Sequence, residues 1–300
     1  MIRTLARKMK ILSFGEIIWD VYGPSERTLG GAPLNFAAYA AMAGADVYLA
    51  SAVGDDAIGR EAVESVKDLG IDCRYVSVSE KVTGQCLVTL GAGGVPSYRI
   101  LEDVAYDAVE LPDRLFCELD AIAFGTLALR TQKNRDTLER VLKNNKFAEV
   151  YTDLNIRPPF YSVESVRFCL ERSTVVKISD EELPIVTDML FGKRVEIGEA
   201  VKLIFGEFSS IKLLVITCGA DGAYCFGASG ECDFVPSVPA TVVSTVGAGD
   251  SFGAVFLARY LAGVDVTRAL GEAAAVASFV VSNKGSIPEG SKEYIAKICG

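Results

Sequence analysis

Short apolar runs alternate with longer segments of helical periodicity along most of this chain. The apolar runs predict strands at residues 10–18, 46–53, 73–78, 119–124, 149–154, 174–178 and 212–217. The helical periodicity predicts helices at residues 33–43, 57–69, 131–145, 162–170, 195–205, 250–262 and 267–282. This alternation indicates an α/β fold in which a mostly parallel central sheet carries helices on both faces.

One region breaks the alternation, because residues 83–90 and 96–101 read as two strands with only the glycine-rich segment 91–95 between them. We expect this hairpin and residues 19–29 to form a small β lid over the carboxyl ends of the main strands, where open α/β folds bind ligands. An exposed strand edge needs a cover or a partner, so we expect two lids to pair in a homodimer.

No Pro-, Gly- or Ser-rich linker divides the chain, so we expect residues 1–300 to form one α/β domain with the lid at about 19–29 and 83–101. Residues 1–8 precede the first patterned segment and are expected to contribute nothing to the fold. They lack the features of a signal peptide, and no run reaches the roughly 20 apolar residues of a transmembrane helix. We therefore expect a cytoplasmic protein.

Composition narrows the classes of function. The net charge of −9 argues against a general nucleic-acid surface, which is built from clustered Lys and Arg. The eight cysteines form no Cys-x-x-Cys pair and are interpreted as reduced thiols. The chain contains no histidine, which excludes Ser-His and Cys-His catalytic pairs and histidine metal sites from it. General-base catalysis must therefore use a carboxylate.

The segment from Ser244 to Asp250, STVGAGD, precedes a small and apolar helix-like run. Gly247 and Gly249 let the backbone approach a ligand closely, and the amides at a helix start attract anions. Asp250 falls in the first helical turn, where a charged carboxylate is favoured and can take a proton from an alcohol during phosphoryl transfer. The alternative interpretation is an ordinary helix-capping Asp after a glycine turn.

A second glycine-rich segment, GGAPLNFA at residues 30–37, also precedes a predicted helix. Asn35 within it can both donate and accept hydrogen bonds, as recognition of a polyol requires. A turn followed by a helix start is the alternative.

The two segments together, with Gly44 and Gly54 at fitting distances, resemble the two signatures of the PfkB carbohydrate kinases, the ribokinase-like group. Similar segments extend over nearly the whole chain: FGEIIWD at 14–20, DLNIR at 153–157, KISDEE at 177–182, TCGADGA at 217–223 and NKGSIP at 283–288. GEIIWD, DLNIR and AYDAV at 105–109 resemble the fructokinase branch most closely. The resemblance implies a ribokinase-like fold with a β lid. It also implies ATP-dependent transfer of the γ-phosphoryl group to a hydroxyl of a small neutral sugar, most similar to a fructokinase.

The resemblance implies a catalytic base and a sugar site. Asp250 matches the family's base, and the amides of Gly247, Ala248 and Gly249 match its anion hole. The matching sugar-binding residues are Asp20, Gly31, Asn35 and Arg157. Arg157 could bridge the sugar and the transferring phosphate, because a planar guanidinium can hold spreading charge. A solvated carboxylate at the end of the first strand and a surface salt bridge are the alternatives for Asp20 and Arg157.

The resemblance also implies sites for the nucleotide and its metal ions. The matching nucleotide-binding positions are Ser179, Thr217, Gly219, Gly222, Ala274 and Asn283. Glu182 matches the residue that positions Mg²⁺, largely through water, although Ser179 stands where the family motif has Asn. The alternative is that Asp180, Glu181 and Glu182 are all solvated charges at a helix start. A monovalent cation such as K⁺ would lie near Ser244, Val246 and Ser286.

Ser244 stands where many relatives carry Asp, so we expect weak activation by K⁺, unless Ser244 simply caps the turn.

Several other functions are open at this point. A kinase of the same fold could act on 2-keto-3-deoxygluconate, ribose or a nucleoside; an acidic sugar needs cationic contacts, for which Arg157 and Arg99 are the candidates. A non-catalytic sugar or nucleotide sensor is a further alternative. A dinucleotide oxidoreductase is not supported, because GAGGVP at 91–96 lacks the last glycine of its fingerprint and lies in a hairpin. No P-loop motif occurs.

Overall fold

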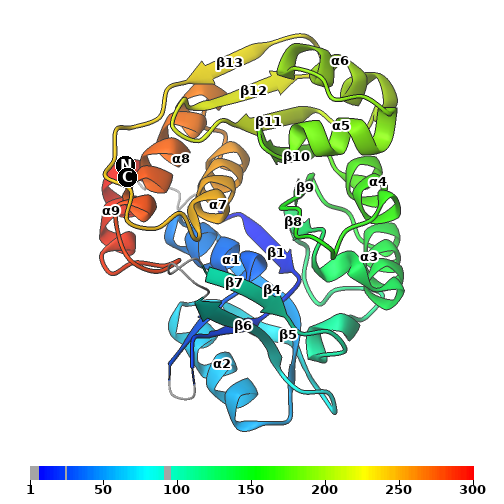
Figure 1. Cartoon of the computed structure of the whole chain (residues 1–300), viewed down its shortest axis with the longest axis vertical. Coiled ribbons are helices and arrows are strands. Elements are labelled where there is room, and N and C mark those ends of the chain that lie inside the picture. The colour runs from blue at the N-terminus through cyan, green and yellow to red at the C-terminus, as the bar shows by residue number, and fades with distance from the viewer. Residues whose placement is uncertain (1–6, 24–25, 91–95) are drawn as a thin grey trace.

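The computed structural model describes residues 7–23, 26–90 and 96–300, which form two sheets and their covering helices (Figure 1). The large sheet has the strand order β13-β12-β11-β10-β9-β8-β1-β4-β5. Its strands are β1 (Lys10–Phe14), β4 (Asp46–Gly54), β5 (Asp72–Ser79), β8 (Ala121–Gly125), β9 (Glu149–Asp153), β10 (Val175–Ser179), β11 (Leu213–Thr217), β12 (Ala223–Gly227) and β13 (Cys232–Val235). Neighbouring strands from β5 to β11 are parallel, whereas β12 and β13 pair antiparallel at one edge.

Helices cover both faces of the large sheet, as the alternating pattern predicts (Figure 1). One face carries α1 (Ala32–Met42), α2 (Ala57–Asp68), α7 (Ala248–Leu261), α8 (Val266–Val281) and α9 (Ser291–Cys299). The other carries α3 (Gln132–Asn144), α4 (Val163–Arg172), α5 (Leu183–Phe191) and α6 (Ile197–Glu207). Successive strand residues serve opposite cores, since Ile11 and Val175 pack on the first face and Leu12 and Val176 on the second.

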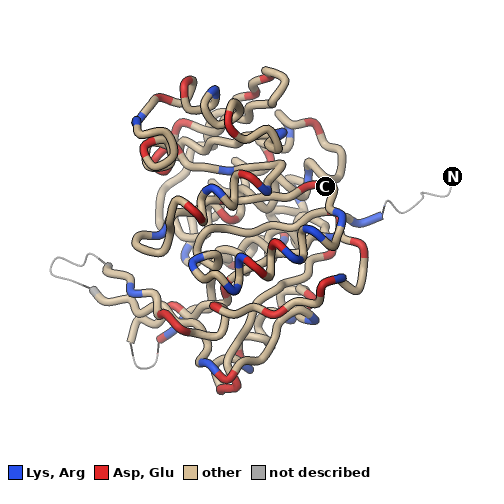
Figure 2. Tube along the Cα trace, turned by 90° about the vertical axis from the view of Figure 1, so that its right-hand side faces the viewer, with Lys and Arg blue, Asp and Glu red and all other residues tan. Residues whose placement is uncertain are grey.

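The small sheet has the order β3-β2-β6-β7, from β3 (Arg27–Gly30), β2 (Ile18–Val21), β6 (Gly84–Leu90) and β7 (Pro96–Ile100). These strands occupy the residues predicted for the lid, 19–29 and 83–101, while the loop 91–95 lies outside the described residues. That the small sheet closes over a ligand remains a prediction. Figure 2 shows acidic and basic positions interspersed along the face that it presents.

The predicted first strand, residues 10–18, is wrong as a single element. β1 ends at Phe14, and β2 begins at Ile18 in the small sheet, so Asp20 lies on the small sheet and not at the end of β1. The chain departs at Gly15, where a Cβ would lie 2.4 Å from Cγ of Pro33. Only glycine permits this close approach to the start of α1.

The sequence patterns did not predict α5, α9, β12 or β13. Residues 1–8 were expected to contribute nothing, yet Arg7 pairs with Asp120 at 2.9 Å and Lys8 with Asp46 at 3.5 Å. Both cations are largely exposed, so these pairs stabilise the fold only slightly. Residues 1–6 lie outside the described part of the chain. Among the described helices, none has both the length and the apolar composition needed to span a bilayer.

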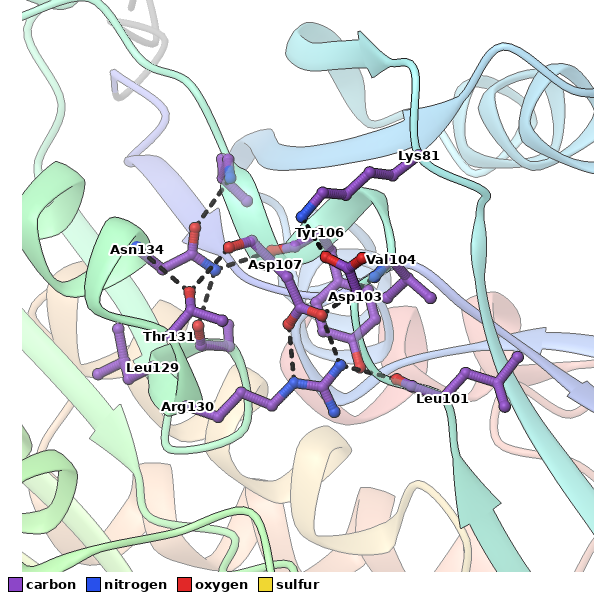
Figure 3. Close-up of polar contacts among 12 residues, drawn as sticks. Lys81, Leu101, Asp103, Val104, Tyr106, Asp107, Leu129, Arg130, Thr131 and Asn134 are labelled. Carbon is purple, nitrogen blue, oxygen red and sulfur yellow. Dashed lines mark hydrogen bonds and ion pairs between the residues drawn. The ribbon is translucent and has the colours of Figure 1, made fainter.

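One of the connections between the small sheet and the body is the segment 101–109, here called the root, which includes the short helix η1 (Ala105–Ala108). Figure 3 shows Arg130, at the end of η2 (Ala128–Arg130), directed at Asp107 of the root. Nε and Nη2 of Arg130 donate to the two Asp107 carboxylate oxygens at 2.7 and 2.9 Å, and Nη2 also donates to the Leu101 carbonyl at 2.7 Å. The Asn134 side chain binds Tyr106 O and the amide of Val109. The root is therefore fixed to the body by a buried polar network.

Candidate active site

Two helix starts bring Asn35 and Asp250 together, although they are far apart in the chain. Asn35 lies in the first turns of α1 and Asp250 in the first turn of α7, and these helices pack against each other. Nδ2 of Asn35 donates to Oδ2 of Asp250 at 2.8 Å. Oδ1 of Asn35 is buried and has no hydrogen-bond partner among the described residues. Asn35, predicted as a sugar ligand, therefore also orients the predicted base.

The start of α7 requires glycine for a steric reason. Gly247 is the N-cap with φ +82°, and a Cβ there would lie 2.6 Å from the carbonyl oxygen of Ser286. Ala248 and Gly249 open the helix, and the first amides of a helix have no partner within it. This turn can therefore present backbone N–H groups and the positive end of the helix dipole to an anion.

A buried ion pair lies beneath this turn. Nζ of Lys177, on β10, donates to Oδ2 of Asp153, at the end of β9, at 2.8 Å. Lys177 is only 5% exposed, and a Cβ on Gly249 would lie 3.3 Å from its Nζ. Burial raises the pKa of Asp153 to about 6, although the charge of Lys177 acts against this rise. The Lys177 ammonium thus underlies the turn that carries Asp250.

Glu16, in the loop between β1 and β2, is a further buried carboxyl at the site. It is 4% exposed, and its Oε1 accepts a hydrogen bond from the amide of Ala32 at 3.1 Å. Burial raises its pKa to about 7, and the nearby charge of Asp250 adds to the rise. Glu16 therefore caps α1 from outside the helix, where Gly31 offers no side chain.

Lys177 and Glu16 are site residues that the sequence analysis did not identify. A signal existed in both cases, because each is a charged residue enclosed by an apolar strand-like run, VVKIS and FGEII. Charged side chains are rarely buried without a partner, so such placements suggest a polar site in the interior.

Burial also raises the pKa of Asp250, the predicted base. The hydrogen bond from Asn35 counteracts this most, followed by the charges of Lys177 and Arg157. One neighbouring donor and two cations therefore favour the ionised form in a buried setting that would otherwise disfavour it.

The remaining predicted sugar residues lie around the same site. Asp20 is partly buried on β2, where burial raises its pKa and the charge of Arg157 lowers it. Arg157 is exposed and forms no ion pair with any described residue, so the predicted salt-bridge alternative finds no partner there. Gly31 caps α1 with φ +113°, and a Cβ there would meet the carbonyl of Glu16 at 2.5 Å.

The predicted magnesium-positioning residue, Glu182, is tightly held by protein donors. Its Oε1 accepts from the amide of Ile156 at 2.5 Å, and its Oε2 accepts from the amide and hydroxyl of Ser179 at 2.9 and 3.0 Å. A carboxylate oxygen has room for more than one donor, so a metal-bound water can still reach it. Within the described residues, no group of three or more His, Cys, Asp or Glu could hold a metal directly.

The other predicted nucleotide positions differ in how much surface they offer. Thr217 ends β11, and a Cβ at Gly219 would meet no atom within 4 Å. Gly222 is required by the fold itself, because a Cβ there would lie 2.1 Å from Val235 O. Ala274 is 7% exposed in the core on α8, and Asn283 caps that helix by donating to Phe279 O at 2.7 Å.

The predicted monovalent-cation residues lie on two adjoining loops. Ser244 Oγ accepts from the amide of Val246 at 3.3 Å, which is the turn-capping bond that was the alternative interpretation. The Ser286 carbonyl, which touches Gly247, accepts from the Tyr39 hydroxyl at 2.7 Å. Both loops therefore adjoin the start of α7.

One cavity lies at the candidate site and another beside the root. A cavity of about 30 Å³ is bordered by Glu16, Asp153 and Asp250. A larger one, about 610 Å³, lies beside the root, but its lining charges Lys81 and Arg130 are paired with Asp103 and Asp107. Three of the carboxyl groups with raised pKa values therefore converge on the smaller cavity.

Comparison with known proteins agrees with this geometry. The model of the pfkB family carbohydrate kinases matches residues 8–292. The chain is 27% identical to the sugar kinase PH1459 of Pyrococcus horikoshii, over 96% of this chain and 94% of that protein. It is 30% identical to a 2-dehydro-3-deoxygluconokinase of Thermoproteus tenax, over 87% and 81%. It is 29% identical to a fructokinase of Rhizobium leguminosarum bv. trifolii, over 83% and 78%.

Solved structures show the same fold. The crystal structure of PH1459 from Pyrococcus horikoshii in complex with ATP has a TM-score of 0.79 at 26% identity, over 95% of this chain and 99% of that one. A fructokinase from Vibrio cholerae O395 with fructose, ADP and calcium ion has a TM-score of 0.81 at 22% identity, over 96% and 98%. The predicted ribokinase-like α/β fold is thereby confirmed, and the chain belongs to the pfkB family of carbohydrate kinases.

Proposed function

We propose that this carbohydrate kinase transfers the γ-phosphoryl group of ATP to a hydroxyl of a small neutral sugar, with fructose as the first candidate. The observation that carries the proposal is the Asn35–Asp250 hydrogen bond at the start of α7. It directs a partly buried carboxylate to the same helix terminus that can bind an anion. Relatives described as fructokinases and a related structure with ATP support the reaction class.

In the proposed mechanism, Asp250 accepts the proton of the attacking hydroxyl as the bond to phosphorus forms. The amides of Gly247, Ala248 and Gly249 stabilise charge on the phosphoryl oxygens. Arg157 forms no ion pair with a described residue, and its charge lowers the pKa of Asp20 and of Asp250, so it can bridge the sugar and the phosphate. Asn35 holds the base in one orientation.

The strand register supports a neutral sugar. Asp20 pairs with Cys86 across β2 and β6, and Cys86 pairs with Ile100 across β6 and β7, so these side chains share one face of the small sheet. Arg99 is the residue before Ile100 and therefore points to the opposite face. One of the two candidate cations for a sugar carboxylate is thus directed away from the face of Asp20.

Mg²⁺ would neutralise the phosphate charge, and Glu182 with Ser179 fits a contact through water. We place the nucleotide along Thr217, Gly219, Gly222, Ala274 and Asn283, and a monovalent cation such as K⁺ near Ser244, Val246 and Ser286. We further propose one kinase domain over residues 1–300 that acts in the cytoplasm as a homodimer through its small sheet, an assembly that light scattering at micromolar concentration would detect.

A coupled ADP-release assay over fructose, ribose, glucose, tagatose, 2-keto-3-deoxygluconate and adenosine tests the proposal. We expect fructose to give the highest kcat/KM. If 2-keto-3-deoxygluconate gives the highest value, the chain is instead a kinase for that acid, as its Thermoproteus tenax relative is described. Absence of ADP release with every compound would favour a sensor.

Asp250→Asn tests the base itself. We expect kcat to fall at least about a hundredfold while ATP still raises the unfolding temperature, because the amide keeps the shape but cannot take the proton. Asp265→Asn is the matched control, since Asp265 also lies at a helix start, as the N-cap of α8. Near-normal turnover of Asp250→Asn would contradict the proposed mechanism.

A further inference from the structure

The Lys177 side chain runs along the underside of the first two turns of α7. Its Nζ lies 3.3 Å from the position of a Cβ on Gly249, and its Cδ lies 3.6 Å from that of a Cβ on Gly253. The two glycines are four residues apart and so share one helix face. The missing side chain of Gly249 leaves room for the lysine ammonium, whereas a Cβ on Gly253 would first meet the Tyr151 hydroxyl, at 2.0 Å. Asp250 lies between the two glycines in the sequence.

A buried Lys177 ammonium at the start of α7 is electrostatically unfavourable unless anions lie nearby. The first turn of a helix is the positive end of its dipole, so a buried ammonium there is repelled. Asp153 supplies one counter-charge, through a single hydrogen bond of 2.8 Å. Burial lowers the pKa of Lys177, but the charges of Asp153, Glu182 and Asp250 outweigh burial and raise it above its usual value. The ammonium therefore stays charged.

We propose that Lys177 is a positioning residue that keeps Asp250 ionised and seats the first turn of α7 on β10, with Asp153 holding the ammonium in place. This inference rests on the proposed function, because it assigns a task to Lys177 only if Asp250 is the base. The charge of Lys177 reaches Asp250 through a buried, poorly screened region, whereas Arg157 is exposed to solvent. Lys177 accordingly has the larger influence on Asp250 of the two cations.

A purely structural role fits the geometry less well. A buried ion pair is no more stabilising than a well-packed apolar pair of the same volume. The Lys177–Asp153 pair is also incompletely satisfied, because Asp153 Oδ1 has no hydrogen-bond partner among the described residues. What Lys177 provides beyond packing is a positive charge near Asp250, which Asp153 fixes in place.

Several charged or titratable groups face Asp250 from the elements around it, and a change of pH acts on all of them. They are Glu16 after β1, Tyr39 on α1, Tyr151 and Asp153 on β9, Arg157 after β9, and Lys177 on β10. Lys177 and Arg157 favour the ionised carboxylate, whereas Glu16 and Asp153 disfavour it when they are ionised. Lysine and aspartate substitutions should therefore act in opposite directions.

The experiment compares Lys177→Met with Asp153→Asn over pH 5–9, using the best sugar from the panel. Lys177→Met removes the cation and should raise the apparent pKa of the acid limb of kcat/KM by at least about one unit. This is the low end of the pKa shift that a nearby opposite charge causes. At a pH below the limb we expect kcat to fall about tenfold for a shift of one unit, with KM for the sugar within about twofold. Asp153→Asn removes a like charge, so its acid limb should move to lower pH.

Controls separate this inference from the proposed function. Lys212→Met removes a lysine from another ion pair, with Glu149, and should leave the acid limb unchanged. An unmoved limb in Lys177→Met, with Asp250→Asn inactive, would overturn the role of Lys177 and leave the proposed function standing. Near-normal turnover of Asp250→Asn would overturn the proposed function itself.

For each variant, the rise in unfolding temperature that ATP produces is measured to show that the variant is folded and binds the nucleotide. If Lys177→Met does not fold, Asp153→Asn decides: a limb shifted to lower pH supports the inference, and an unmoved or raised limb contradicts it.

Discussion

Two buried ion pairs hold two regions of this kinase, and they differ in how completely their polar atoms are satisfied. At the root, Arg130 makes two hydrogen bonds to Asp107 and one to a carbonyl, and its guanidinium lies 4.8 Å from the centre of the Phe160 ring. At the active site, Lys177 makes one bond to Asp153, and one carboxylate oxygen of that residue has no partner among the described residues.

The two regions also differ in the groups that surround each ion pair. Nη1 of Arg130 also lacks a hydrogen bond, but it belongs to a guanidinium packed between the rings of Tyr106 and Phe160. The active-site region instead concentrates carboxyl groups whose pKa values burial raises: Glu16 to about 7, Asp153 to about 6, and Asp250 above its usual value. Perturbed titrating groups of this kind gather where proton transfer takes place.

The largest expected effect on stability follows from a substitution at the root. Arg130→Met leaves the Asp107 carboxylate buried without its cation, so we expect the free energy of unfolding to fall by about 3–5 kcal/mol. Urea unfolding measures it. Arg140→Met is the matched control, because Arg140 pairs with Asp113 at the surface and should cost about 1 kcal/mol or less. Equal losses in the two variants would show that the root pair is no stronger than a surface pair.

A smaller effect of opposite sign is expected in the active-site region. The pKa of Glu16 is raised from 4.5 to about 7 in the folded protein, so the fold loses stability as pH rises from about 4.5 to about 7 and Glu16 ionises. Glu16→Gln keeps an oxygen for the Ala32 amide and removes that loss. We expect it to stabilise the protein by about 3 kcal/mol at pH 8 and hardly at all at pH 4.

Unfolding in urea at both pH values checks the Glu16 prediction. Glu64→Gln serves as the control, since Glu64 is exposed and pairs with Lys67 on the surface of α2. A destabilised Glu16→Gln at pH 8 would mean that the carboxylate is needed in its charged form.

The smallest effect is expected at the solvent margin of the active site. Ser244 supplies a neutral hydroxyl that caps its own turn, so a nearby K⁺ would gain no carboxylate. Ser244→Asp should lower the K⁺ concentration for half-activation about threefold, because a carboxylate attracts the cation. Initial rates are measured with tetramethylammonium chloride holding ionic strength constant. Strong activation of the native enzyme at low millimolar K⁺, unchanged in Ser244→Asp, would contradict this prediction.

Much of the large sheet could be predicted from sequence, because parallel buried strands such as 212–217 contain a continuous apolar run, here LLVI at 213–216. The antiparallel edge was missed, since β12 is an apolar run of only five residues and β13 has four residues, one of which is Asp233. The break at Gly15 was missed for another reason. It depends on contact with Pro33, which a local pattern does not contain.

At the site, motifs placed Asp250 and Asn35 at helix starts, and both lie there. Their mutual hydrogen bond could not be predicted, because it depends on how α1 and α7 pack. Lys177 and Glu16 were given no role by the motifs, although each is a charged residue within an apolar run, and their burial in the folded chain shows that they belong to the site.

The absence of histidine makes the buried carboxyl groups unusually easy to observe. In most proteins, imidazole groups titrate between about pH 5.5 and 7.5 and obscure other groups. Among the described residues, burial raises the pKa values of Glu16 and Asp153 into that interval and also raises those of Asp20 and Asp250, while the described thiols with resolved shifts have pKa values raised above their usual range. Carbon-13 labelling of the Glu and Asp carboxyl groups would therefore give a titration spectrum in which a signal that moves near neutral pH reports on the buried carboxyl groups of the proposed active site.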